Sequence, residues 1–240
     1  DSSAVAWGHS TKGGAPSIDL VDIKHIVGSA GAFAAIKTDG TVIAWGEAEY
    51  GGSIPSSISS LLVNIVEIVS TDKYFAARDE DGTVFIWGNG EKAYDSGFTG
   101  ISKVYANKNA FAFLDQDENV YAGGDEDKGG DTKTKQQDLT NVKQIYNTDE
   151  AFLALRQDGK IVVWGEIDTT AGPTSDFYEQ VLDVYPSKYA FGLSYLKAYR
   201  PKQLINGQVY ESTTSWRIRQ SFSVIGSIVR GKPNLAENVS

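Results

Sequence analysis

Apolar and polar positions alternate along the chain in short runs, and the runs return about every 40 residues. The run AFAAIK at 32–37 is followed by an Asp-Gly pair and then by TVIAWG at 41–46, and nearly the same order returns at 74–88. Alternation with a period of two predicts β-strands, and Asp-Gly between two such runs predicts a tight hairpin. A preceding run, such as DIKHIVG at 22–28, predicts a third strand, so each unit is expected to form a small antiparallel sheet.

The repeat keeps its spacing from copy to copy. Each of four copies has a Phe, a turn pair 6 and 7 residues later, and a Trp or, in the third copy, a Gly 12 residues later. A fifth copy contains Phe191 but carries an insertion before Asn206-Gly207 and has Ser212 at the Trp position. The four regular pairs are Phe33 with Trp45, Phe75 with Trp87, Phe111 with Gly123, and Phe152 with Trp164.

Three short strands cannot bury their apolar faces alone, so units of this kind stack in arrays. A ring of small sheets leaves only short, protected edges, and we therefore predict an all-β fold, a β-propeller. The count is about six blades, or alternatively seven, with the N-terminal strand SAVAWG at 3–8 completing the last blade. Residues 1–212 hold the repeats, and residues 213–240 form a degenerate last blade or the start of a further repeat in the same domain. Trp45, Trp87 and Trp164 are expected to be buried between blades.

The combined motif resembles a known family. V-x-x-W-G, a Gly-Gly pair about five residues on, an upstream A-F-x-A and an intervening D-G-x-V resemble the regulator of chromosome condensation repeats, over roughly residues 4–212. The short unit is most similar to secreted bacterial and protist members, including propellers that inhibit β-lactamases. The resemblance implies a β-propeller in which loops of one rim bind a protein partner. Nucleotide exchange and chromatin binding are not carried over, because this chain is acidic and its units are shorter.

Composition narrows the possible partners and location. The net charge of −9 and the pI near 4.8 argue against nucleic acid as the main partner, and no apolar run is long enough to span a membrane. The absence of cysteine excludes disulfides and thiolate sites. The absence of methionine and the start at Asp1 favour a mature product without its targeting segment, or a fragment. We expect a chain that is extracellular, at the cell surface or in an organelle lumen.

No motif indicates catalysis, a metal or a cofactor, and the chain is predicted not to be an enzyme. The only histidines, His9 and His25, lack any marked partner for a general base. The stretch 115–126 has Asp115, Asp117, Asn119 and Glu126 at positions 1, 3, 5 and 12 of a calcium loop but lacks the Gly at position 6. The Gly-Gly pairs at 13–14, 51–52 and 129–130 do not form the phosphate-binding motifs G-x-x-x-x-G-K-S/T or G-x-G-x-x-G. We therefore expect no metal site and no cofactor.

The short loops before each Phe are the best candidate site. They read SAGA (29–32), TDKY (71–74), NKNA (107–110), TDEA (148–151) and SKYA (187–190), so their flanks repeat while their centres vary. In a ring these loops converge on one rim and form a mixed, mostly polar surface, although solvated turns without a function are an alternative. The predicted partner-binding residues of this rim are Asp72, Lys73, Tyr74, Lys108, Asn109, Asp149, Glu150, Lys188 and Tyr189.

A second candidate surface lies near the C-terminus. From Leu196 onward there are seven basic and two acidic residues, which gives +5, so the first 195 residues carry −14. Complementary charge favours contact with an acidic surface, and Arg and Tyr are enriched at interfaces. The predicted contact residues are Tyr199, Arg200, Arg217 and Arg219.

Three classes of function remain. We favour a non-catalytic propeller that mediates protein contacts as a secreted or surface subunit of an assembly, with other protein subunits, including copies of itself, as partners. The second is a soluble inhibitor or receptor-like binder, which would be expected to carry more aromatic anchors on its rim. The third, a propeller hydrolase or lyase, needs a cluster of carboxylates or histidines that the sequence does not show.

Overall fold

A computed structural model describes residues 2–90, 92–95, 97–167, 180–199, 202–205, 208–211 and 217–225. For residues 92–95, 133–134, 197–199 and those after 201, only the backbone is described. Helix is scarce in these ranges, as predicted. One α-helix, α1 (Ser56–Ser59), accompanies the 3-10 helices η1 (Ser10–Lys12), η2 (Ala48–Tyr50), η3 (Glu126–Lys128) and η4 (Lys133–Asp138).

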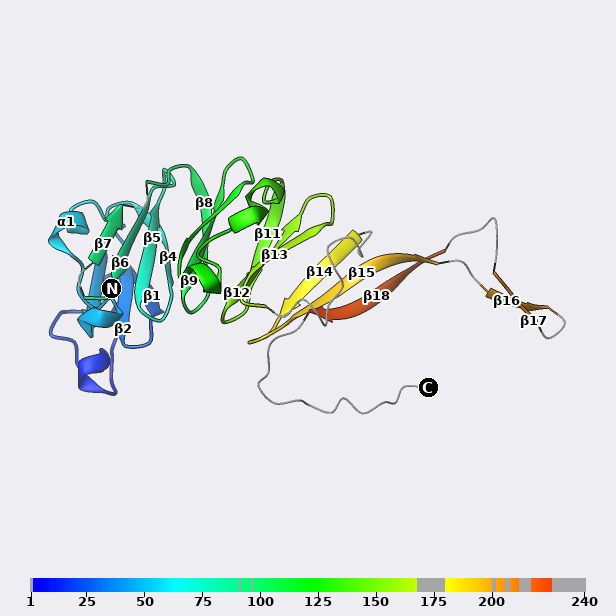
Figure 1. The fold of residues 1–240 in the computed structure, drawn as a ribbon. Coiled ribbons are helices and arrows are strands. Elements are labelled where there is room, and N and C mark those ends of the chain that lie inside the picture. Colours follow the sequence, from blue (N-terminus) through cyan, green and yellow to red (C-terminus); the bar gives the residue numbers. More distant parts are fainter. Residues whose placement is uncertain are drawn as a thin grey trace.

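Five antiparallel sheets follow one another along the chain and lie side by side in a row (Figure 1). Each contains three or four short strands, which confirms the sequence-based prediction. The first sheet holds β1 (Ile23–Gly28), β2 (Ala32–Lys37) and β3 (Val42–Gly46), and the second holds β4 (Ile65–Ser70), β5 (Tyr74–Asp79), β6 (Val84–Gly88) and β7 (Lys92–Asp95). The third holds β8 (Ile101–Ala106), β9 (Ala110–Asp115) and β10 (Val120–Gly124), and the fourth holds β11 (Val142–Asn147), β12 (Ala151–Arg156) and β13 (Ile161–Gly165).

The fifth sheet departs from the simple repeat. It joins β14 (Gln180–Pro186) and β15 (Phe191–Tyr199) to β18 (Arg217–Ile225), while β16 (Lys202–Ile205) and β17 (Gln208–Glu211) form a separate two-stranded ribbon. The register places Ile225 opposite Phe191, where the first, second and fourth sheets place Trp opposite Phe and the third places Gly123 opposite Phe111. The prediction that Ser212 takes the position of the Trp was therefore wrong. The strands β16 and β17 pair with each other, and the outer strand of the sheet, β18, comes later in the chain.

The buried Trp residues join neighbouring blades. Trp45, Trp87 and Trp164 are 5%, 0% and 4% exposed, which confirms their predicted burial. Each stacks on the Phe opposite it in the same sheet, with ring centroids 5.3–5.4 Å apart. Each indole Nε1 also donates a hydrogen bond, at 3.0–3.1 Å, to a glycine carbonyl in the loop that precedes its blade. The acceptors are the first residues of the Gly-Gly pairs, namely Gly13, Gly51 and Gly129.

The second glycine of each pair is required by close approach of the backbone. A Cβ on Gly52 would lie 2.4 Å from the carbonyl carbon of Gly46, and the same approach recurs at the other two pairs. Such a distance leaves no room for any side chain. The Gly-Gly pair thus folds the outgoing loop back onto the end of the outer strand and places the carbonyl that the Trp binds.

The N-terminal segment lies against the first sheet. Ala4 N–H donates to the carbonyl of Leu20 at 2.8 Å, and Ile23 N–H donates to the carbonyl of Ser2 at 2.9 Å. Trp7 in this segment is 84% exposed. Figure 1 shows the N-terminus beside the first sheet and β18 at the other end of the row. Completion of the last blade by residues 3–8, and the number of blades, stay predictions.

Candidate functional site

The candidate rim is built from the five tight loops that join the first and second strand of each sheet. Every loop begins with Ser, Thr or Asn, whose side-chain oxygen accepts hydrogen bonds from the backbone N–H groups two and three residues on. Thr71 Oγ1, for example, accepts from Lys73 N at 3.3 Å and from Tyr74 N at 3.0 Å. Such local bonds fix the loop conformation. The capping residues are Ser29, Thr71, Asn107, Thr148 and Ser187.

Sequence reasoning missed these capping residues. It selected the variable centres of the loops, although the recurrence of Ser, Thr or Asn at the first position of all five was a readable signal. Two of them also donate a hydrogen bond outside their own loop: Asn107 Nδ2 donates to the carbonyl of Lys128, and Ser29 Oγ donates to the carbonyl of Tyr50, each at 2.7 Å. Each of these bonds ties the loop to the segment that leaves the same blade.

The loop tips are joined from blade to blade by backbone hydrogen bonds. The N–H of each tip donates to the carbonyl of the next tip at 2.8–3.2 Å. The predicted convergence of these loops on one rim is therefore seen in the geometry, and we call this row of tips the rim. The order of the bonds is Ala30 to Asp72, Asp72 to Lys108, Lys108 to Asp149, and Asp149 to Lys188.

Charged side chains reinforce the same row. Asp149 Oδ2 lies 2.7 Å from Lys108 Nζ and 3.8 Å from Lys188 Nζ, so one carboxylate bridges three successive blades. The hydrogen bond and the charge of Asp149 raise the pKa of Lys108 above its usual value of 10.5. Glu150 pairs with Lys128 at 3.2 Å. The side chains of Lys108, Asp149 and Lys188, which were predicted to bind a partner, thus also hold the rim together.

The other predicted rim residues differ in exposure. Asp72 and Lys73 are exposed at their loop tip, and Asn109 is half-buried. Tyr74 is half-buried, and its hydroxyl accepts a hydrogen bond from Asn89 Nδ2 at 2.9 Å. Tyr189 is 49% exposed, with Lys188 Nζ 4.8 Å from its ring centroid, within the range of a cation–π contact.

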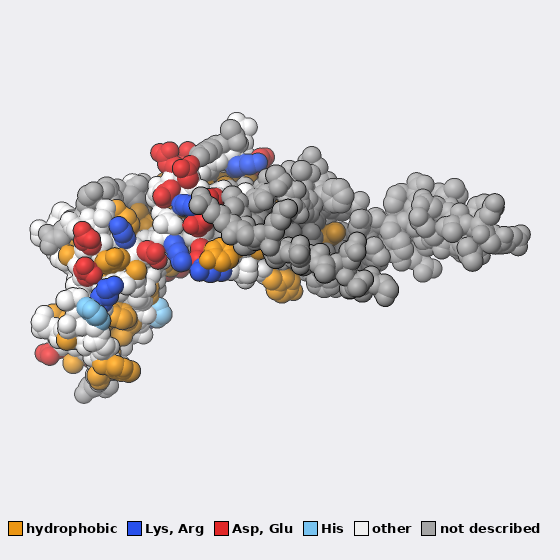
Figure 2. Space-filling model, turned by 60° about the horizontal axis from the view of Figure 1, so that its bottom comes forward, with side chains coloured by type: hydrophobic (Ala, Val, Ile, Leu, Met, Phe, Trp, Pro, Cys, Tyr) orange, Lys and Arg blue, Asp and Glu red, His pale blue; other side chains and the backbone are white. Residues whose placement is uncertain are grey.

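A shallow polar hollow of about 370 Å³ follows the rim and is lined by backbone and side chains of the first four tips. On the face that Figure 2 shows, acidic and basic side chains of the described residues are interspersed. Within the described residues, no three His, Cys, Asp or Glu side chains lie close enough to hold a metal ion. The arrangement offers hydrogen-bonding and charged groups of both signs, which suits contact with the polar surface of another macromolecule.

The second predicted surface can be located only by its backbone. Tyr199 and Arg217 face each other in the register of β15 and β18, and Arg219 pairs with Lys197. Arg200 lies outside the described residues, as do the side chains of Tyr199, Arg217 and Arg219. Their role in a contact stays a prediction. In the described part of the chain, no helix has the length and apolar character that a membrane crossing requires.

Among solved structures, this chain is similar to β-propellers. The chain is similar to the CRINKLY WD40 ectodomain of the Arabidopsis thaliana receptor kinase ACR4, with a TM-score of 0.50 and 15% identity over 75% of this chain and 66% of that chain. It is also similar to yeast RCC1 (Prp20) in a complex with Kap60, with a TM-score of 0.51 and 15% identity over 74% of this chain and 56% of that one. The chain has an RCC1-like propeller fold.

A further similar structure is the ectodomain of the Physcomitrella patens receptor kinase CR4, with a TM-score of 0.52 and 13% identity over 71% of this chain and 48% of that one. The chain thus spans about half to two thirds of the length of these three structures. No protein-family model and no curated protein sequence matches it. At these identities the likeness concerns the fold alone.

Proposed function

We propose that this chain is a non-catalytic β-propeller that binds another protein through its rim. The observation that carries the proposal is the row of backbone hydrogen bonds from Ala30 to Lys188, which fixes five loop tips relative to one another. A surface that is ordered before binding loses less conformational entropy when a partner binds. The variable, polar tips then supply specificity on a constant scaffold.

Charge supports a protein partner. The rim presents Lys73 next to Asp72 and Lys188 beside Asp149, so it offers both signs within a few adjacent loops. Mixed charge of this kind favours a complementary protein surface over a polyanion, which needs clustered basic groups. The complex of yeast RCC1 with Kap60 is an example of a similar propeller that binds a protein.

The proposed setting is a secreted or surface assembly, with other protein subunits or copies of this chain as partners. The similarity to two receptor-kinase ectodomains supports an extracellular location. The second candidate function is the soluble inhibitor of the secreted propellers that the repeats resemble. Exposed Tyr189 is the observation that favours it, because aromatic side chains often anchor tight protein interfaces.

Site-specific photo-crosslinking tests the proposal. The photoreactive residue p-benzoylphenylalanine is placed at Lys73 or Tyr189 on the rim, and at exposed Gln157, in a hairpin turn of the fourth blade, as the control. We expect a discrete protein adduct from the two rim positions that unlabelled wild-type chain competes away. Equal adducts from Gln157, or none from the rim, would contradict a rim-mediated interaction.

Self-association through the basic C-terminal segment is tested separately. Sedimentation of the wild type and of the Arg200→Glu, Arg217→Glu double variant is measured in low and high salt. Because exposed ion pairs are screened beyond about 8 Å at physiological ionic strength, we expect association of the wild type only, and its loss in high salt. Identical sedimentation of all four samples would refute this contact.

A further inference from the structure

The N-terminal segment at 2–8 has the sequence and the contacts of a third strand. Its sequence AVAWG matches VIAWG of β3, and the pair Gly13-Gly14 follows it, as a Gly-Gly pair follows β3 and β10. A Cβ on Gly14 would lie 2.4 Å from the carbonyl carbon of Gly8, which is the close approach found at the other two pairs. The segment therefore corresponds to the third strand of a further blade, and we call residues 2–8 the open blade.

The open blade has no strand beside it in the described part of the chain. In the first sheet, Trp45 lies opposite Phe33 of β2 and stacks on it. Trp7 occupies the position of Trp45, but no described strand lies opposite it. The five pairs of first and second strands cannot fill this place, because each already pairs with a third strand of its own sheet, namely β3, β6, β10, β13 and β18. A first and a second strand, joined as a hairpin, are what the open blade lacks.

Side chains that are buried in the complete blades are exposed at the open blade. Trp7 is 84% exposed, compared with 0–5% for the three buried Trp residues, and Val5 is 79% exposed. Ile26 of β1 is 37% exposed, although the fourth residues of β4, β8 and β11, which take the same position, are 2–4% exposed. An apolar surface that is covered at the other junctions is thus open at the N-terminal end of the row (Figure 1).

The other junctions show which groups cover this surface. Ile68, the counterpart of Ile26, lies in a cluster against which Val27 of the preceding first strand packs. Tyr105 packs in the same way against the cluster that contains Ile145. The second strand supplies the Phe that stacks on the Trp, with ring centroids 5.3–5.4 Å apart. The partner that fits is therefore an antiparallel hairpin with Val or Tyr on one strand and Phe on the other.

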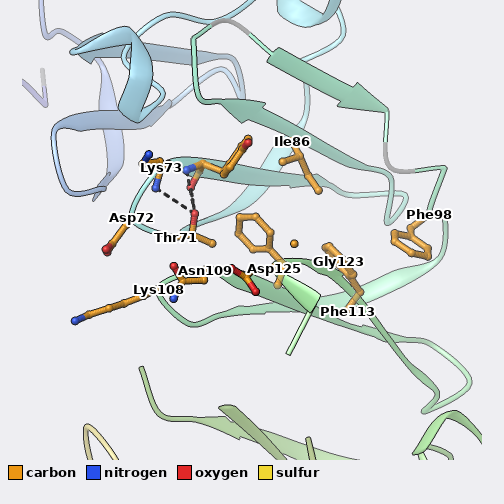
Figure 3. A pocket seen from close by; sticks show the side chains of 13 residues that line it. Thr71, Asp72, Lys73, Ile86, Phe98, Lys108, Asn109, Phe113, Gly123 and Asp125 are labelled. Atoms are coloured by element: carbon orange, nitrogen blue, oxygen red, sulfur yellow. Dashed lines mark hydrogen bonds between the residues drawn. The ribbon is translucent and has the colours of Figure 1, made fainter. Parts of the chain in front are cut away.

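The loop tips offer a further contact of the same kind. At each described junction the N–H of one tip donates to the carbonyl of the next tip, and Figure 3 shows one such pair of tips, with Asp72 and Lys108 labelled. The carbonyl of Ala30, in the first tip, accepts no hydrogen bond from the described residues. The tip of a hairpin added to the open blade would lie beside this carbonyl and could donate to it.

We propose that the open blade binds a β-hairpin of another protein chain, which pairs with residues 3–7 and covers Trp7 and Ile26. Addition of strands to an exposed strand is a common mode of protein recognition, in which backbone hydrogen bonds give affinity and side-chain contacts give specificity. The backbone N–H and C=O groups of Val5 and Trp7 have no hydrogen-bond partner among the described residues. This surface lies at the end of the row and includes none of the charged rim residues, so it goes beyond the function proposed above.

The experiment uses a synthetic peptide of residues 142–156, which carries the first and second strands of the fourth blade with Tyr146 and Phe152. Binding of the fluorescently labelled peptide is measured by anisotropy, and a peptide of the same composition in scrambled order is the control. We expect saturable 1:1 binding of the peptide with a dissociation constant of about 100 μM or below, and no saturable binding of the control. Phe152→Ala in the peptide should weaken binding, because the ring that stacks on Trp7 is lost.

Variants of the protein test which residues the peptide contacts. Trp7→Ala is expected to weaken binding at least about tenfold, as is typical of an aromatic anchor that becomes buried in an interface. Because Trp7 is exposed in the free protein, this variant should fold normally. Leu61→Ala, which removes an apolar side chain of 48% exposure from the segment before β4, should leave binding unchanged.

A fusion tests the same contact within one chain. Residues 142–159 are placed directly before Ser3, so that Gly159 takes the position of Ser2 and the hairpin is held at a high effective concentration. We expect the melting temperature to rise by roughly 4 °C or more, because the added hairpin buries exposed apolar side chains. The rise should disappear in a fusion that also carries Trp7→Ala.

Each of four results would overturn the inference. These are the absence of saturable binding of the peptide to the wild type, equal binding of the scrambled peptide, equal binding to the wild type and to Trp7→Ala, and a fusion whose melting temperature does not rise. Loss of the crosslinks from the rim would leave the inference standing, because peptide binding is measured without a partner of the rim.

Discussion

Replacement of Trp87 tests how the blades are held together. This side chain is fully buried, stacks on Phe75 with centroids 5.4 Å apart, and donates from Nε1 to Gly51 of the preceding loop at 3.0 Å. Trp87→Ala leaves a cavity and removes both contacts, and we expect it to lower the free energy of unfolding by about 3–5 kcal/mol. Trp87→Phe keeps a ring but leaves the buried Gly51 carbonyl without its donor, so a smaller loss of roughly 1–3 kcal/mol is expected.

The measurement is a urea titration followed by far-UV circular dichroism. Trp7→Ala is the matched control, because Trp7 also directly precedes a Gly but is 84% exposed, and surface substitutions usually change stability by less than about 0.5 kcal/mol. A loss below about 1 kcal/mol for Trp87→Ala would mean that the Trp is not a buried link between blades. Equal losses for the Ala and Phe variants would mean that the hydrogen bond, and not the ring, dominates.

Three further predictions follow from single contacts. Gly52→Ala should lower the melting temperature strongly, because its Cβ would lie 2.4 Å from the backbone of Gly46; an unchanged melting temperature would refute the close approach. Asp149→Asn should lower the pKa of Lys108 measured by NMR, and since Asp149 raises that pKa, its stabilising effect is present below 10.5 and disappears as the pH rises through the raised value. Burial raises the pKa of Tyr105 above 10.0, so the unfolded chain loses this proton first and the free energy of unfolding falls above that pH. The fall should be smaller in Tyr105→Phe, and an equal fall of both proteins in urea titrations above pH 10.0 would contradict this.

The regular spacing of the repeat made most of the fold predictable. Phe and Trp positions 12 residues apart, with a turn pair between them, predicted the hairpins, and the buried Trp residues confirmed the interpretation. The fifth sheet could not be predicted in this way, because its outer strand is separated from β15 by the ribbon of β16 and β17, and the sequence between those two strands is a second Asn-Gly pair of the kind that the repeat places between paired strands. Counting the fixed spacing from the Asn206-Gly207 pair places Ser212 at the Trp position, whereas the strand register places Ile225 opposite Phe191.

The candidate rim was predictable in position but not in internal structure. Variable residues between repeating flanks predicted where the tips would gather. The sequence did not reveal that Asp149 forms ion pairs with Lys108 and Lys188, because these residues belong to three different copies and meet only when the blades are stacked. Contacts between copies depend on how each blade is placed on the next, and the pattern within one copy carries little information about that placement.

The interblade contact is therefore a unit that straddles two copies of the repeat. Trp87 belongs to the second blade, but the carbonyl that it binds belongs to the loop that leaves the first, 36 residues earlier. A Gly-Gly pair without the following Trp would present a buried carbonyl with no donor, and a Trp without the pair would bury an indole N–H with no acceptor, and each case is unfavourable. The two parts should thus be kept or lost together. The junction before the third blade, where Gly123 replaces the Trp and the pair is absent, has lost both, so neither that donor nor that acceptor is left unsatisfied there.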